Sequence, residues 1–114
     1  MHYCSGRNAD TCNSTAIYSA PKGAVVQLTR QVAIGNAKHR IHCNALCPGY
    51  TQTAVLAEAF LQMPEGISVV AGSLHPFRDL GKPEDLAGPA VFLASNDAQW
   101  VTGVVMAVDG GFTI

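Results

Sequence analysis

Tyr18 and Lys22 stand four positions apart in the segment AIYSAPKGAVVQLTRQ, which spans residues 16 to 31. On a helix this spacing places both side chains on one face, so the phenol and the ammonium group would point into the same space. A free tyrosine has a pKa of about 10, and a positive charge held nearby favours the phenolate form. The pair is therefore a candidate for general acid/base chemistry. The same spacing also fits a packed tyrosine beside a solvated lysine.

The segment that carries this pair predicts a long amphipathic helix over residues 16 to 38. Apolar residues recur along it at helical spacing: Val25, Leu28 and Val32. Pro21 is acceptable in the first turn, where its missing N–H does no harm. The helix is therefore expected to begin close to Ile17 or Tyr18.

The rest of the chain predicts two strands separated by helices. Alternating residues over 41 to 47 and a compact apolar run over 104 to 108 favour strands. Between them, helices are expected over residues 53 to 62 and from Pro83 to Ala94, with an irregular stretch over 63 to 82. Strands joined by connections of this length are parallel and covered by helices, which predicts an α/β fold.

Composition restricts the class of protein. The chain has 114 residues, 48% hydrophobic and 13% charged, which indicates one small folded domain. A net charge of −1 without a basic run argues against a nucleic-acid or anionic-membrane partner. No apolar run approaches the roughly 20 residues that a membrane span needs. We expect a cytoplasmic protein.

The cysteines and histidines show no metal-ligand spacing. Cysteines occur without a CxxC pair: Cys4, Cys12, Cys43 and Cys47. Reduced, mostly buried thiols are expected, and no metal site. Histidines that lack ligand spacing are expected on the surface or in a strand: His39, His42 and His75. Trp100 is expected to pack at a junction between elements.

Four segments together resemble the short-chain dehydrogenase/reductase family. Tyr18-Ser-Ala-Pro-Lys22 resembles its YxxxK signature, and Ser5 lies thirteen positions before Tyr18, the spacing that this family uses for its catalytic serine. CNALCPGYTQT resembles its strand and proline-glycine loop, and LGKPEDLAGPAVFLASNDAQWVTGVVMAVDGG resembles its C-terminal helix and last strand. The likeness extends from Ser5 to Gly111.

The resemblance implies a catalytic role for three residues. Tyr18 would donate a proton to a carbonyl oxygen or take one from an alcohol. Lys22 would favour the phenolate and hydrogen-bond the nicotinamide ribose. Ser5 would hold and polarise the substrate oxygen. Ser14 is the rival hydroxyl, but four residues before Tyr18 it is expected to cap the helix.

The resemblance also implies a cofactor and a substrate class. Backbone groups of Pro48, Gly49 and Thr51, with the Thr53 hydroxyl, would fix the nicotinamide carboxamide while the cofactor supplies the hydride. Thr51 stands where an aliphatic residue is common in the family. The cofactor would be NADP or NAD, with NADP slightly favoured, and the substrate a small carbonyl compound or alcohol.

One hallmark of the family is absent from these 114 residues: the glycine-rich turn between a strand and a helix that holds the pyrophosphate. We therefore expect residues 1–114 to be the C-terminal half of such a domain, with a Rossmann-like parallel sheet, flanking helices and no N-terminal half of the fold. Whether the chain is itself an enzyme stays open. It could be a truncated NAD(P)-dependent oxidoreductase, a non-catalytic fragment that associates with a full-length relative, or a degraded gene product.

Missing neighbours bear on how such a chain behaves. Parallel strands without their neighbours expose hydrophobic edges, and such edges invite association. We expect the isolated chain to be oligomeric, poorly soluble or partly molten. Its partners would be copies of itself or other chains of the same family.

Overall fold

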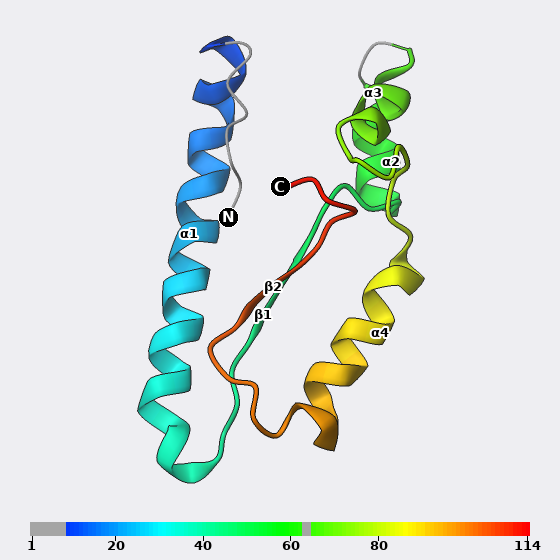
Figure 1. The fold of residues 1–114 in the computed structure, drawn as a ribbon. Coiled ribbons are helices and arrows are strands. Elements are labelled where there is room, and N and C mark those ends of the chain that lie inside the picture. Colours follow the sequence, from blue (N-terminus) through cyan, green and yellow to red (C-terminus); the bar gives the residue numbers. More distant parts are fainter. Residues whose placement is uncertain (1–8, 63–64) are drawn as a thin grey trace. The chain divides into compact units, whose positions relative to one another are not determined.

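The computed structural model describes residues 9–62 and 65–114 (Figure 1). Ser5, expected as a catalytic residue, lies outside these described residues. The chain divides into two compact units. Unit 1 comprises residues 1–45, as far as they are described, with 99–105 and 113. Unit 2 comprises residues 46–98, 106–112 and 114.

The sheet has two strands in the described part of the chain, β1 (Ala45–Pro48) and β2 (Val105–Val108). Its pairing continues at both ends, where Ala45 N donates to Val104 O at 2.9 Å and Gly49 N donates to Val108 O at 3.2 Å. Both strands advance together along these bonds, so they are parallel. The predicted α/β class is confirmed: the two strands are paired in one parallel sheet, and helices separate them along the chain.

The first strand begins later than the alternation over residues 41 to 47 predicts. Side chains make most of the contacts just before it. Asn44 donates through Nδ2 to Val101 O at 3.2 Å and accepts through Oδ1 from Val104 N at 3.1 Å. The Thr102 hydroxyl accepts from Cys43 N at 3.3 Å. An amide side chain can replace a backbone ladder in this way, so the two segments stay paired although the regular strand is short.

Unit 1 is built on α1 (Ala9–Asn36), which a short 3₁₀ turn, η1 (Ala37–His39), extends. The expected start near Ile17 or Tyr18 is wrong, and Ser14 lies inside the helix rather than at its cap. Pro21 is also internal. A proline within a helix removes one backbone hydrogen bond. The remaining backbone hydrogen bonds of this 28-residue helix are enough to keep the segment helical through Pro21.

Small side chains form the buried face of α1. Thr29 and Ala33 are 6% and 2% exposed, whereas Leu28 is 62% exposed. The Thr29 hydroxyl donates to Val25 O at 2.9 Å. Gly103, with a φ of +72°, approaches so closely that a Cβ on it would lie 3.5 Å from the Ala33 Cβ. The helix therefore packs closely against the segment that leads into β2.

Unit 2 contains three α-helices in its described part: α2 (Ala54–Leu61), α3 (Ile67–Ser73) and α4 (Pro83–Ala94), with the 3₁₀ turn η2 (Asn96–Ala98). The helices predicted over 53 to 62 and from Pro83 are confirmed. The irregular stretch expected over 63 to 82 is wrong in part, because α3 lies within it. Gly66, in the left-handed conformation with a φ of +84°, directly precedes that helix.

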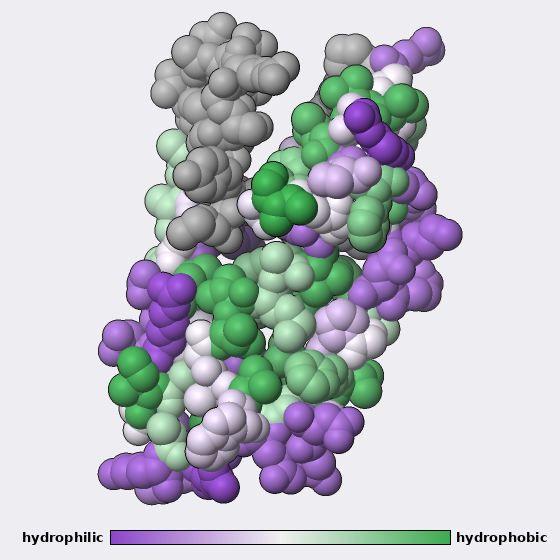
Figure 2. Space-filling view, viewed as in Figure 1, coloured by the Kyte–Doolittle hydropathy of each residue, from purple (hydrophilic) through white to green (hydrophobic). Residues whose placement is uncertain are grey.

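Large apolar side chains are exposed in both units. Among the described residues, the buried apolar side chains are Ala33, Ala71 and Ala98, and no large side chain is fully buried. Figure 2 shows green apolar residues between purple polar ones over the face in view. No helix in the described part of the chain is both long and apolar enough to cross a membrane.

Candidate functional site

The Tyr18–Lys22 pair lies one turn apart on α1, as its spacing predicts. The Lys22 ammonium nitrogen is 5.3 Å from the centroid of the Tyr18 ring. A cation at this distance from an aromatic face is attracted by the ring quadrupole. Both side chains are exposed, and Tyr18 has 54% of its surface accessible. Tyr18 is therefore exposed on α1 with a positive charge near the face of its ring.

The second part of the expected site is the loop between β1 and α2, residues 49–53, in unit 2. It is held by a parallel bridge between Thr51 and Gly81. Gly81 N donates to Tyr50 O at 2.9 Å, and Gln52 N donates to Gly81 O at 2.8 Å. The Thr51 side chain is 9% exposed, and its hydroxyl donates to Gly49 O at 3.1 Å. The loop is thus fixed by a hydrogen bond within residues 49–53 and by backbone hydrogen bonds to Gly81.

This bridge determines where the backbone groups of Thr51 point. In an extended segment, successive peptide groups point to opposite sides. Because the groups on either side of Thr51 bond to Gly81, its own N–H and C=O face the other way. One donor and one acceptor side by side match the carboxamide of a nicotinamide, which also has one of each. The geometry of Thr51 therefore fits the backbone contact that the resemblance implies.

Gly49 is enclosed so closely that no side chain fits. A Cβ placed on it would lie 2.7 Å from His75 Nε2 and 3.0 Å from the Asp109 Cα. Gly49 therefore lets the loop pass close to the turn after β2. Pro48, the last residue of β1, is exposed at the start of the loop.

The Thr53 hydroxyl, expected to bind the nicotinamide carboxamide, also makes a contact within the protein. It is the N-cap of α2, where its hydroxyl oxygen accepts from Leu56 N at 3.2 Å. An N-cap oxygen used in this way keeps its own hydrogen for donation. The Thr53 hydroxyl can thus cap the helix and donate to a ligand at once.

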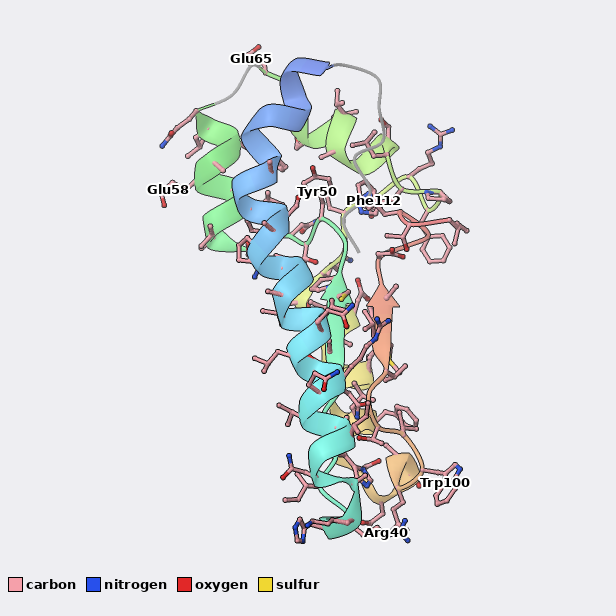
Figure 3. All side chains as sticks on the ribbon, turned by 90° about the vertical axis from the view of Figure 1, so that its left-hand side faces the viewer. Arg40, Tyr50, Glu58, Glu65, Trp100 and Phe112 are labelled. Carbon is pink, nitrogen blue, oxygen red and sulfur yellow. The ribbon has the colours of Figure 1, made fainter. Side chains whose placement is uncertain are left out.

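His75 is the residue of this region that sequence reasoning missed. It was expected on the surface or in a strand, but it is 2% exposed and follows α3 by two positions. Its ring lies near those of Tyr50 and Phe112, with centroids 5.8 and 5.2 Å away. Figure 3 shows Tyr50 and Phe112 close together, and their ring centroids are 5.6 Å apart. Nothing in the spacing of the histidines distinguishes this one.

A hollow of about 570 Å³ lies beside the loop in unit 2. The loop supplies Tyr50 and Thr51 to its wall, and His75 and Asp109 line it from other segments. Near the start of α4, the cationic Lys82 and the anionic Asp85 also line it. The loop thus borders an open space large enough for part of a small ligand.

The structure differs from two other expectations, which concern Trp100 and the cysteines. Trp100 does not pack at a junction: it is 90% exposed, and the Arg40 guanidinium carbon lies 5.9 Å from its ring centroid (Figure 3). Cys43 and Cys47 are half-buried free thiols. Within residues 9–62 and 65–114, no three His, Cys, Asp or Glu side chains gather as a metal site would require.

The expected site residues thus fall into two groups. Tyr18 and Lys22 belong to unit 1, whereas Pro48, Gly49, Thr51 and Thr53 belong to unit 2. Within each group, the described geometry is compatible with the role that the resemblance implies.

Comparisons with known proteins extend this picture. The sequence profile of a family described as enoyl-(acyl carrier protein) reductase matches residues 1–113. The chain is 42% identical over 102 residues to the inactive 2-(S)-hydroxypropyl-CoM dehydrogenase 2 of Xanthobacter autotrophicus, covering 88% of this chain and 44% of that protein.

Solved structures share the fold. A short chain dehydrogenase family protein from Francisella tularensis superposes with a TM-score of 0.75 at 26% identity, over 84% of this chain and 43% of that one. The angucycline C-6 ketoreductase LanV with bound NADP gives a TM-score of 0.74 at 32% identity, over 83% of this chain and 35% of that one. The chain spans less than half the length of each of these relatives.

Proposed function

The chain belongs to the short-chain dehydrogenase/reductase family, and on this premise we propose that it takes part in NAD(P)-dependent oxidoreduction of a small carbonyl compound or alcohol. The observation that carries the proposal is the Tyr18–Lys22 pair, with the ammonium 5.3 Å from the ring centroid on an exposed part of α1. The bound nicotinamide would supply or accept the hydride.

Tyr18 is the proton donor in this proposal. In the direction of reduction, its phenol gives a proton to the substrate oxygen as that oxygen becomes an alcohol. The Lys22 ammonium stabilises the negative charge left on the phenol oxygen. In the direction of oxidation, the same oxygen takes the proton back. Ser5, outside the described residues, is proposed to hold the substrate oxygen.

The loop after β1 is proposed to bind the nicotinamide. Thr51 offers a backbone donor and acceptor that face away from Gly81, and the Thr53 hydroxyl has a hydrogen to donate. Pro48 and Gly49 bring the backbone to this position without a bulky side chain. Lys22 is proposed to bind the ribose. These contacts orient the ring so that one face meets the substrate.

The pyrophosphate of the cofactor has no comparable cradle in the described residues. Their strand-to-helix connection, residues 49–53 between β1 and α2, contains one glycine. A dinucleotide fingerprint needs several glycines that open a helix. We therefore propose that residues 1–114 act as the C-terminal half of the family's domain, together with a segment that supplies the phosphate contacts.

NADP is favoured over NAD in the proposal, because the ketoreductase LanV is similar in structure and was solved with bound NADP. We also propose a cytoplasmic location and assembly with copies of this chain or with other members of the family. The exposed apolar side chains of both units favour such assembly.

A second candidate is a non-catalytic protein that acts by associating with a full-length relative. One observation favours it: the curated relative described above is named as inactive. This candidate predicts association without turnover. It requires no role for the phenol of Tyr18.

The experiment is a calorimetric titration of the purified chain with NADPH and then NADH, followed by a turnover assay that monitors reduced nicotinamide with ketone substrates. Lys22→Ala is expected to weaken NADPH binding about tenfold, as the loss of one charge-assisted hydrogen bond does. Tyr18→Phe is expected to keep binding and to abolish turnover. Lys38→Ala, an exposed lysine beyond the end of α1, is the matched control.

The outcomes separate the two candidates. The nicotinamide site is supported if binding is saturable, is weakened by Lys22→Ala and is unchanged by Lys38→Ala. Turnover that survives in Tyr18→Phe contradicts the proposed proton donor. A folded chain that binds neither nucleotide contradicts nicotinamide binding by residues 1–114 alone, and means that the chain either needs the segment with the phosphate contacts or is the non-catalytic candidate.

A further inference from the structure

His75 is buried and bonded through both ring nitrogens. It is 2% exposed, and its Nδ1 lies 3.0 Å from Ala71 O. Its Nε2 lies 3.2 Å from Tyr50 N. The two contacts reach in different directions, one to the last turns of α3 and the other to the loop after β1.

These partners determine the form of the ring. A backbone N–H can only donate, so Nε2 must accept from Tyr50 and carry no hydrogen. A carbonyl can only accept, so Nδ1 must carry the hydrogen that bonds to Ala71 O. The contacts therefore require the neutral imidazole with its hydrogen on Nδ1. In this form no polar atom of the buried ring is left unpaired.

The same ring also limits the loop sterically. His75 Nε2 is the atom nearest to a Cβ built on Gly49, at 2.7 Å. The Phe112 ring also contacts the His75 ring, tilted by 37° with its centroid 5.2 Å from that of His75. A Cβ on Gly110, just after β2, would lie 3.7 Å from the Cβ of His75. The histidine thus holds three segments of unit 2 together: the end of α3, the loop after β1 and the turn after β2.

We infer that His75 is a positioning residue that fixes the backbone of residues 49–51 in the conformation that binds nicotinamide. The inference rests on the proposed function. His75 touches neither substrate nor cofactor in it. By accepting from Tyr50 N, it fixes the peptide plane between Gly49 and Tyr50. That plane directly precedes the one that carries the Thr51 N–H and that is held by the bond from Gly81 N to Tyr50 O. By donating to Ala71 O, it joins that loop to α3.

A matched pair of substitutions separates positioning from stability. In His75→Gln, the longer amide places an oxygen near Nε2, so the bond from Tyr50 N is kept and the bond to Ala71 O is lost. In His75→Asn, the shorter amide places an N–H near Nδ1, so the bond to Ala71 O is kept and the one from Tyr50 N is lost. Each variant loses one hydrogen bond. A purely structural role predicts equal effects.

Two measurements are made on the full chain and on both variants. Amide hydrogen exchange of Tyr50 reports the bond to the ring. Titration with NADPH reports the nicotinamide site. In His75→Asn we expect exchange at Tyr50 at least about tenfold faster and NADPH affinity about tenfold weaker than in His75→Gln, with equal thermal midpoints. Nitrogen chemical shifts of the ring are expected to show hydrogen on Nδ1 alone.

The inference can fail separately from the proposed function. If the unmodified chain binds NADPH and the two variants bind it equally, the positioning role is overturned and the proposed function stands. A ring with hydrogen on Nε2 also overturns it, since that nitrogen could not accept from Tyr50. If no chain binds NADPH while exchange differs as expected, nicotinamide binding by residues 1–114 alone is overturned, together with the nicotinamide part of the inference.

Discussion

At the scale of single residues, Gly49 shows how closely the candidate loop is packed. Gly49→Ala is expected to destabilise the chain by about 1–3 kcal/mol, as overpacking does. The added Cβ would meet a buried ring at 2.7 Å and the Asp109 backbone at 3.0 Å, and neither can move freely. The measurement is the free energy of unfolding from urea denaturation.

Gly88 is the matched control for this substitution, since it lies in α4 of the same unit and a Cβ there would meet no atom within 4 Å. Gly88→Ala is expected to stabilise by about 0.5–1 kcal/mol, because alanine loses less entropy than glycine in a helix. Equal effects of the two substitutions would contradict the packing argument for Gly49.

Two residues illustrate what the sequence could predict at this scale. The shared face of Tyr18 and Lys22 follows from a spacing of four within one helix, so local sequence was sufficient to predict it. The partners of His75 include Tyr50, 25 positions away, and the bond forms only once α3 and the loop are folded. No periodicity encodes such a contact, and the residue type alone favoured the surface.

At the scale of elements, prolines were informative where they begin a helix and misleading where they lie within one. Pro83 marked the first residue of α4 correctly, because its missing N–H is unpaired there in any helix. Pro21 suggested a helix start near Ile17 or Tyr18, whereas α1 begins eight or nine residues earlier, at Ala9. The turns around Pro21 supply enough backbone bonds to override its preference. The short helix α3 was missed because ISVVAGS combines β-branched residues with glycine.

This difference between the prolines is testable. Pro21→Ala is expected to raise the stability of α1 by up to about 3 kcal/mol, since it restores a donor to the carbonyl four residues before and removes the clash of the proline ring with it. Pro83→Ala, at a helix start, is expected to change stability by less than about 0.5 kcal/mol. Circular dichroism during thermal unfolding measures both. A Pro21→Ala chain with no gain in helicity or midpoint would show that the proline is accommodated without cost.

At the scale of the whole molecule, the fold class was predictable and the extent of burial was not. The order of helices and strands was sufficient to predict a parallel α/β arrangement, and the solved relatives share the fold. A hydrophobic content of 48% indicated a folded domain. Among the described residues, however, the buried apolar side chains are three alanines, while Ile34, Leu61 and Trp100 are 71%, 87% and 90% exposed. Composition reports what a chain could bury and not whether these residues have neighbours to cover them.

Because so many apolar side chains are exposed, we expect the chain to associate. Parallel sheets are normally covered on both faces and paired at their edges, and the sheet in the described residues has two strands, β1 and β2, each with an outer edge. The purified chain is therefore expected to elute from size exclusion as oligomers whose size grows with concentration, and to bind the apolar dye ANS. Light scattering on the eluate gives the mass independently of shape. Association that removes ANS binding would mean that the exposed side chains are covered by copies of the chain, whereas oligomers that still bind the dye would indicate a partly molten state. A monomer of 12.0 kDa that unfolds sharply and binds no ANS would contradict the argument, because it would require apolar contacts that bury far more than Ala33, Ala71 and Ala98.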